Sequence, residues 1–211
     1  MDLIELENAI PKPYQDQVEE ELGSNRMLWT LAEEVARSAS GFATGYPGFG
    51  HLAYLADPEE PLISPMSSLL LPILFVFCEK ANIPYNALIR IRVGLFTRTI
   101  TDVKHHNPHV DYGEPHRTAV YYVNDCDGDT FLFDETFDDV SVEDSGRYAN
   151  ANRFTLNRSI APKKGKMICF DGRHYHAHPI EGHRHAMLLA REAFHQNGLR
   201  DRLECAAADS L

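Results

Sequence analysis

Residues 119–133 read AVYYVNDCDGDTFLF, two short apolar runs on either side of a turn rich in Asp and Gly. Val, Tyr, Phe and Thr favour strands, and Asp-Gly favours tight turns, so Asp125–Asp129 is expected to join two strands as a β-hairpin. Other short runs of this kind follow along the chain without helical patterns between them. Many short strands without alternating helices indicate an antiparallel sandwich or barrel.

The expected strands share β-branched or aromatic residues and are bounded by turn residues. They are Leu88–Phe96, Ala119–Val123, Thr130–Phe133, Arg153–Ile160, Lys166–Phe170 and Arg184–Phe194. In the first strand, apolar residues alternate with Arg90 and Arg92. That alternation predicts a strand with one face on the core and the other exposed to solvent.

The first third of the chain predicts helices. Tyr14–Ser38 combines acidic residues with spaced apolar ones, as one or two helices do, and the glycine-rich Gly41–Gly50 predicts a loop. Met66–Ala81 is apolar and too long for an ordinary strand, so we expect a buried helix. Ser64 suits its N-cap and Pro65 its first position.

The length of 211 residues fits a single structural domain. Within it we expect a helical support in residues 1–85, a β core in 86–195 and a C-terminal tail in 196–211. The net charge of -11, without a run of Lys or Arg, argues against a nucleic-acid partner.

The cysteines predict the compartment. There are four, Cys78, Cys126, Cys169 and Cys205, scattered without a CxxC pair, which indicates free thiols in the reducing cytoplasm. The N-terminus lacks the basic and apolar regions of a signal peptide. The apolar run from Ser68 to Phe77 is too short to cross a bilayer, so no membrane partner is expected.

His109-Val110-Asp111 is the first candidate metal motif. Residues two apart on a strand face the same side, so this imidazole and this carboxylate can bind one metal ion. A second histidine, distant in sequence, would complete the two-His-one-carboxylate triad typical of non-haem Fe(II) oxygenases. The stretch Cys169–Pro179 supplies three candidates two residues apart, His174, His176 and His178.

Arg184 stands eight residues after His176, at the start of the apolar strand that ends the β region. An arginine that enters a barrel needs an anionic partner, because a lone buried charge is costly. A dicarboxylate cosubstrate would supply that partner through a planar two-point contact.

The order of these motifs resembles the prolyl 4-hydroxylase-like branch of the 2-oxoglutarate/Fe(II)-dependent dioxygenases, in particular its small members from bacteria and marine phages. The resemblance covers about residues 86–194 and includes the phrase Phe170-Asp-Gly-Arg-His-Tyr-His176-Ala. It implies a mainly β fold, a double-stranded β-helix (jelly roll) with supporting N-terminal α-helices. It also implies Fe(II), 2-oxoglutarate and O2 as cofactor and cosubstrates.

Carried onto this chain, the resemblance implies that His109, Asp111 and His176 hold Fe(II). Arg184 would bind the far carboxylate of 2-oxoglutarate, and Tyr122 would donate a hydrogen bond to it, while the neighbouring Tyr121 points away and packs in the core. The spacing from His176 to Arg184 is shorter than is usual in the family. His174 would restore that spacing and is the alternative ligand, and His178 is expected beside the metal ligands or the substrate.

The resemblance favours a protein or peptide substrate, such as a prolyl residue. The segments Gly41–His51 and Thr99–Pro108 are either the mouth of the pocket or ordinary surface loops. Two other functions remain open: a cupin-like metalloenzyme that does not use 2-oxoglutarate, and a non-catalytic jelly-roll binding module. Calcium is not expected, because the Asp-rich turn lacks the Gly and Glu positions of an EF-hand loop.

Overall fold

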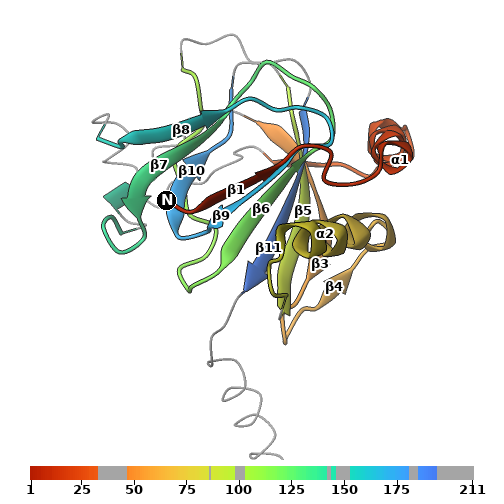
Figure 1. The fold of residues 1–211 in the computed structure, drawn as a ribbon, viewed down its shortest axis with the longest axis horizontal. Coiled ribbons are helices and arrows are strands. Elements are labelled where there is room, and N and C mark those ends of the chain that lie inside the picture. Colours follow the sequence, from red (N-terminus) through yellow and green to blue (C-terminus); the bar gives the residue numbers. More distant parts are fainter. Residues whose placement is uncertain are drawn as a thin grey trace, which may run out of the picture.

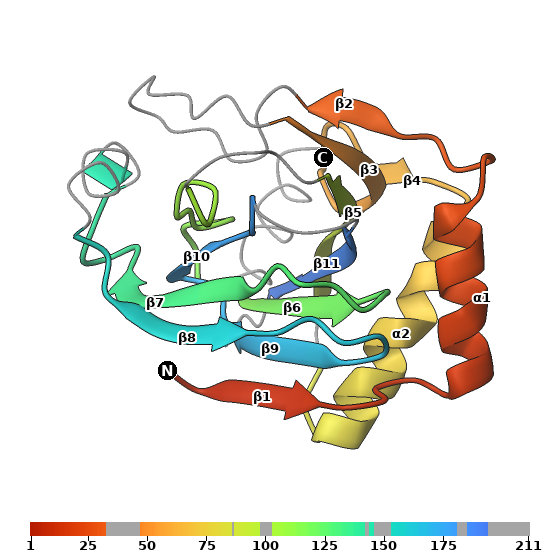
Figure 2. The same ribbon diagram turned by 90° about the horizontal axis from the view of Figure 1, so that it is seen from above.

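In the computed structural model the described residues form two β-sheets and two helices. Those residues are 1–32, 47–85, 87–97, 103–141, 144–145 and 153–180, together with the backbone of 185–193. The helices are α1 (Lys12–Gly23) and α2 (Ser67–Ala81). Both lie on the same side of the larger sheet, and the smaller sheet lies on its other side (Figures 1 and 2).

The larger sheet is antiparallel, with the strand order β1-β9-β6-β11-β5-β3-β2 and with β4 paired to β3. Its strands are β1 (Leu3–Leu6), β2 (Thr30–Ala32), β3 (Gly48–Leu55), β4 (Leu62–Ile63), β5 (Ala87–Phe96), β6 (Arg117–Tyr122), β9 (Met167–Asp171) and β11 (His185–Ala193). Strands from the first third of the chain therefore lie beside strands of the expected β core.

The smaller sheet has the order β10-β7-β8. Its strands are β7 (Thr130–Thr136), β8 (Leu156–Ile160) and β10 (His174–Ala177). Isolated bridges from His105 to Pro179 and from His109 to His176 add the segment before β6 to its edge. The chain crosses between the sheets from β6 to β7, from β8 to β9 and from β10 to β11, which makes the fold a jelly roll, as expected.

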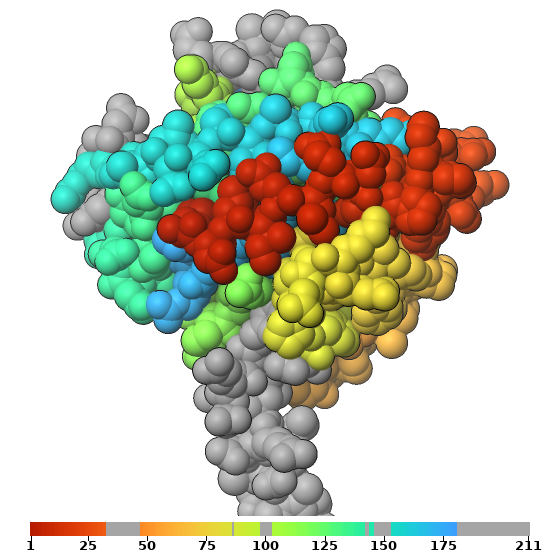
Figure 3. Space-filling view, viewed as in Figure 1, coloured from red at the N-terminus to blue at the C-terminus, as the bar shows by residue number. Residues whose placement is uncertain are grey.

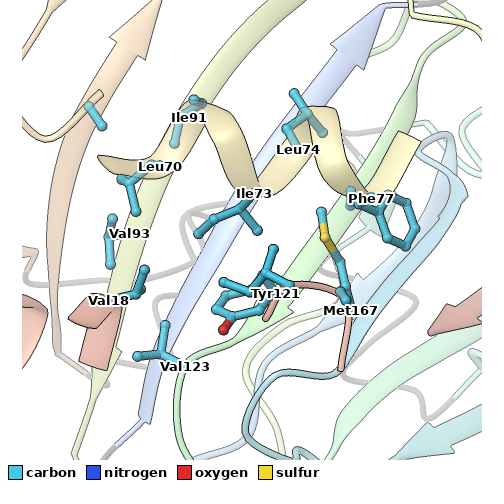
Figure 4. Close-up of a cluster of buried hydrophobic side chains, with 14 of the residues drawn as sticks. Val18, Leu70, Ile73, Leu74, Phe77, Ile91, Val93, Tyr121, Val123 and Met167 are labelled. Carbon is cyan, nitrogen blue, oxygen red and sulfur yellow. The ribbon is translucent and has the colours of Figure 1, made fainter. Parts of the chain in front are cut away.

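Helix α2 covers one face of the larger sheet. Its buried side chains are Leu70, Ile73, Leu74, Phe77 and Cys78, and Figure 4 shows four of them against Ile91, Val93, Tyr121 and Met167. The helix is apolar enough to be buried, yet no helix among the described residues is long and apolar enough to cross a membrane. In the space-filling view, the N-terminal residues and α2 cover adjacent parts of one face (Figure 3).

The space between the two sheets is filled by a second cluster: Phe96, Val120, Tyr122, Leu132, Ile160, Ile168 and Phe170. Tyr121 belongs to the α2 cluster and Tyr122 to this one, because successive strand residues face opposite sides. The expected opposite orientation of the two tyrosines is therefore found. Both faces of the larger sheet are buried, one by helix and one by sheet.

The first 85 residues are less helical than expected. Helix α1 ends at Gly23, where Ser24 adopts an extended conformation (φ -77°, ψ 159°) and its hydroxyl donates a hydrogen bond to the Glu21 carbonyl. Strand β2 follows at Thr30–Ala32 and β3 begins at Gly48, inside the expected loop. The glycines of β3 fit a strand because the interior approaches it closely, a tertiary effect that local composition does not report.

Two local expectations were wrong. Helix α2 begins at Ser67 with Met66 as its N-cap, because Ser64 pairs with the end of β3 by donating its N–H to the Ala53 carbonyl. The turn at Asp125–Asp129 does not close a hairpin either. It carries the chain from one sheet to the other, since β6 pairs with β9 and β11 whereas β7 pairs with β8 and β10.

The packing of α2 predicts how stability depends on its two sides. Leu74 is fully buried, so Leu74→Ala should lower the free energy of unfolding by about 2–5 kcal/mol, through lost burial and the cavity left behind. Its neighbour Phe75 is 46% exposed and contacts the Tyr85 ring, so Phe75→Ala should cost less than about 1.5 kcal/mol. Urea denaturation of both variants checks this, and equal losses would contradict the packing described.

Candidate metal centre

Two of the expected ligands face each other across a backbone bridge. The His109 N–H donates to the His176 carbonyl and the His176 N–H donates to the His109 carbonyl, both at 2.9 Å. Directly opposed residues of such a bridge place their side chains on the same side. The ring centroids of His109 and His176 are accordingly 4.6 Å apart.

Asp111 reaches the same point from two residues beyond His109. One carboxylate oxygen lies 3.7 Å from His109 Nε2, and the other lies 3.3 Å from His176 Nε2. One ligand atom from each of the three residues lies within 4.8 Å of the others. The structure therefore brings His109, Asp111 and His176 into one cluster able to hold a metal ion.

The orientation of both rings is fixed by backbone carbonyls. His109 Nδ1 lies 3.2 Å from the Asn107 carbonyl and His176 Nδ1 lies 3.3 Å from the His174 carbonyl. A carbonyl only accepts hydrogen bonds, so each Nδ1 carries the proton and each Nε2 presents a lone pair. This is the arrangement in which a neutral imidazole binds a metal through Nε2.

The surroundings of the His176 ring fit a metal ion. Its side chain is fully buried, and its Nε2 has no hydrogen-bond partner among the described residues although a carboxylate oxygen lies 3.3 Å away. Burial lowers the pKa of His176 to about 4, so protonation does not resolve the contact at neutral pH. Two lone-pair atoms face each other, and a divalent cation between them would satisfy both.

Arg90 was not expected at this centre. Its guanidinium lies 3.5 Å from Asp111 Oδ1, which holds the carboxylate from the side of β5. The sequence predicted that Arg90 and Arg92 lie on a solvent face. That was wrong because the second face of the larger sheet is covered by the smaller one. The sequence did contain a signal for this: the two arginines stand in an otherwise apolar strand, which indicates charges that meet a partner inside the protein.

The remaining expected residues make different contacts. Tyr122 is buried between the sheets, and its hydroxyl donates a hydrogen bond to Thr130 Oγ1 at 2.9 Å. His174 is turned to the Phe133 carbonyl, 3.2 Å from its Nδ1. His178 stacks on Phe96 with ring centroids 4.9 Å apart. Arg184 lies outside the described residues.

The two segments expected at the pocket mouth are only partly described. Of Gly41–His51, the structure describes residues 47–51, where β3 begins, and of Thr99–Pro108 it describes residues 103–108. The rest of both segments, with the expected tail at 196–211 and Cys205, lies outside the described residues. Among the described cysteines, Cys78, Cys126 and Cys169 are free thiols.

Solved structures share this fold. An oxidoreductase of the 2OG-Fe(II) oxygenase family from Burkholderia pseudomallei aligns over 90% of this chain and 85% of its own, with a TM-score of 0.60 and 12% identity. HygX from Streptomyces hygroscopicus, solved with nickel and 2-oxoglutarate, aligns over 91% and 83%, with a TM-score of 0.56 and 11% identity. A prolyl-4-hydroxylase from Pseudomonas putida aligns over 90% of each chain, with a TM-score of 0.52 and 10% identity.

No family model matches the chain, and no curated protein matches it by sequence. The structural likeness nevertheless confirms the expected fold: the chain has the jelly roll of the 2-oxoglutarate/Fe(II) oxygenases.

The cluster predicts which histidine matters for metal affinity. His176→Ala removes a buried lone pair and should weaken Mn(II) binding by more than about 100-fold, beyond the loss typical of groups that only support a ligand. His174→Ala, the matched control on the same strand, should change affinity less than about threefold, because His174 is not part of the cluster of possible ligand atoms. Titration followed by Mn(II) electron paramagnetic resonance measures both. The reverse order of effects would make His174 the ligand.

Proposed function

We propose that this protein is a 2-oxoglutarate- and Fe(II)-dependent dioxygenase that hydroxylates its substrate. The observation that carries this proposal is the cluster of His109, Asp111 and the buried His176 inside a jelly roll. Two imidazoles and one carboxylate leave positions free on one side of the metal, which suits a reaction that must also bind a chelating cosubstrate and O2.

In this proposal the bound iron, with 2-oxoglutarate and O2, supplies the oxidising chemistry, and the protein supplies position and shielding. The bridge between His109 and His176 sets the angle between two ligands before metal binds. Arg90 holds Asp111 toward the same point. The buried surroundings keep water from the reacting atoms.

Arg184 and Tyr122 are the proposed receptors for the far carboxylate of 2-oxoglutarate. Strand β11 begins at the residue after Arg184, where His185 is paired with Phe96, and Met187 two residues later is paired with Tyr122. The Tyr122 hydroxyl is therefore close to the start of β11 and is already buried. In the proposed complex the Tyr122 hydroxyl turns its hydrogen from Thr130 Oγ1 to the carboxylate that the Arg184 guanidinium binds.

The substrate proposed from the family resemblance is a protein or peptide residue such as proline. The Pseudomonas putida structure named as a prolyl-4-hydroxylase has a similar fold, which supports this choice of substrate. The net charge of -11 argues against nucleic acid as the substrate. The free thiols among the described cysteines agree with a cytoplasmic location, which we also propose.

The proposal is tested by anaerobic titration of the metal-free protein with Fe(II) and then 2-oxoglutarate. We expect the weak visible charge-transfer band of an iron-bound keto acid. In Asp111→Ala we expect both the band and succinate production to be lost. Metal binding without the band would favour the cupin-like metalloenzyme. The absence of any metal binding would favour the jelly-roll binding module.

Arg184→Ala should weaken 2-oxoglutarate binding, read from the same band, by about 10- to 100-fold, because a charged hydrogen-bonding partner of a carboxylate is lost. Metal affinity should stay within about threefold of the wild type, since the proposed role lies at the other end of the keto acid. Arg158→Gln, on the exposed face of β8, is the control for removing an arginine. An unchanged 2-oxoglutarate affinity in Arg184→Ala would exclude Arg184 as the receptor.

A further inference from the structure

Arg92 is the charged residue beside the metal cluster that the proposed function leaves unused. On β5 it shares a face with Arg90, Gly94 and Phe96, and Phe96 belongs to the cluster between the sheets. Arg92 therefore also faces the interior of the jelly roll. It lies close enough to His109 and His178 to contribute to the low pKa of both, after burial and the neighbouring histidines.

The two arginines of β5 differ in their counterions. Arg90 is paired with Asp111 at 3.5 Å. No carboxylate among the described residues pairs with Arg92, and burial is the single cause that lowers its pKa. A guanidinium that is partly removed from water without a counterion is costly, and the cost is relieved when an anion binds.

The guanidinium of Arg92 packs against a glycine. Its Nε and Nη2 both lie 3.2 Å from the point where a Cβ of Gly50 would stand. Gly50 is paired with Gly94 across β3 and β5, so two residues without side chains face each other beside Arg92. The Arg92 guanidinium fills the position of a Gly50 side chain, with its Nε–Nη2 edge toward Gly50, and the Phe96 ring fills that of Gly94.

The contact between the Arg92 guanidinium and Gly50 lies on the far side of β5 from Tyr122. Strand β5 separates β3, which carries Gly50, from β11, and β6 with Tyr122 lies beyond β11. At about 4.8 Å between neighbouring strands, Gly50 is about 14 Å from the strand of Tyr122. A five-carbon diacid is at most about 6 Å long, so one molecule held at Tyr122 does not also reach the Arg92 guanidinium beside Gly50.

We infer that Arg92 binds a carboxylate of the primary substrate, on the β3 side of the metal cluster and apart from 2-oxoglutarate. The inference rests on the proposed function and narrows its substrate to an anionic class: a small carboxylic acid, or a peptide that offers an acidic side chain or its C-terminus. The charges agree. Asp111 pairs with Arg90 and Arg184 is assigned to the far carboxylate of 2-oxoglutarate, which leaves Arg92 for a further anion.

The test uses trifluoroacetate as a carboxylate probe and the protein loaded with Mn(II) and saturating 2-oxoglutarate. Mn(II) accelerates the relaxation of fluorine nuclei held near it, so ¹⁹F relaxation reports binding beside the metal cluster. Trifluoroacetamide has a similar shape without charge and is the matched probe. We expect saturable acceleration for trifluoroacetate and much less for trifluoroacetamide.

Arg92→Gln should weaken the binding of trifluoroacetate by about 10- to 100-fold, because a charged hydrogen bond is lost. Arg158→Gln should leave it unchanged. Gly50→Ala keeps the charge but puts a methyl group 3.2 Å from the guanidinium, so intermediate weakening is expected. Arg92→Lys should retain part of the binding, which guards against a variant that merely fails to fold.

Two results would overturn the inference. One is trifluoroacetate binding that is the same in Arg92→Gln as in the wild type. The other is probe binding that is seen only without 2-oxoglutarate, together with weaker 2-oxoglutarate binding in Arg92→Gln, which would make Arg92 a receptor for the cosubstrate. The charge-transfer band distinguishes failure of the proposed function from failure of the inference on Arg92. If the wild type shows no band, the proposed function is refuted. If the band is normal and either result is obtained, only the role of Arg92 is refuted.

Discussion

The metal cluster depends on the pair of backbone hydrogen bonds between His109 and His176. Together with further backbone bonds of residues 104–106, these bonds attach the segment before β6 to the edge of the smaller sheet. Because the bridge joins the two residues directly, it sets both the spacing and the common direction of two imidazoles. Asp111 then needs only the two-residue repeat of an extended chain to reach the same point.

Much of this centre was predictable from the sequence because its spacing rules are local. His109 and Asp111 are two residues apart, and the choice of His176 among three histidines followed from the phrase around it. Among the described residues, the cluster of possible ligand atoms includes His176 but not His174. Strand positions in the second half were also close, since alternation and turn residues are encoded locally.

What the sequence did not predict depends on which elements meet. The alternation in β5 looks the same whether its second face is covered by water or by another sheet, so Arg90 and Arg92 were assigned to solvent. The Asp-rich turn has the composition of a hairpin, but composition does not tell whether the next strand returns to the same sheet. The strands β1 and β3 were missed because their partners β9 and β5 lie far along the chain.

The burial of the larger sheet on both faces has an evolutionary consequence. Each of β5 and β6 serves two environments with alternate residues, as Tyr121 under α2 and Tyr122 between the sheets illustrate. A one-residue insertion in such a strand would exchange its faces and would turn Arg90 and Arg92 toward the apolar helix. Inserted or deleted residues are therefore expected outside the paired strands or at bulges, such as the register shift between Arg191 and Glu192.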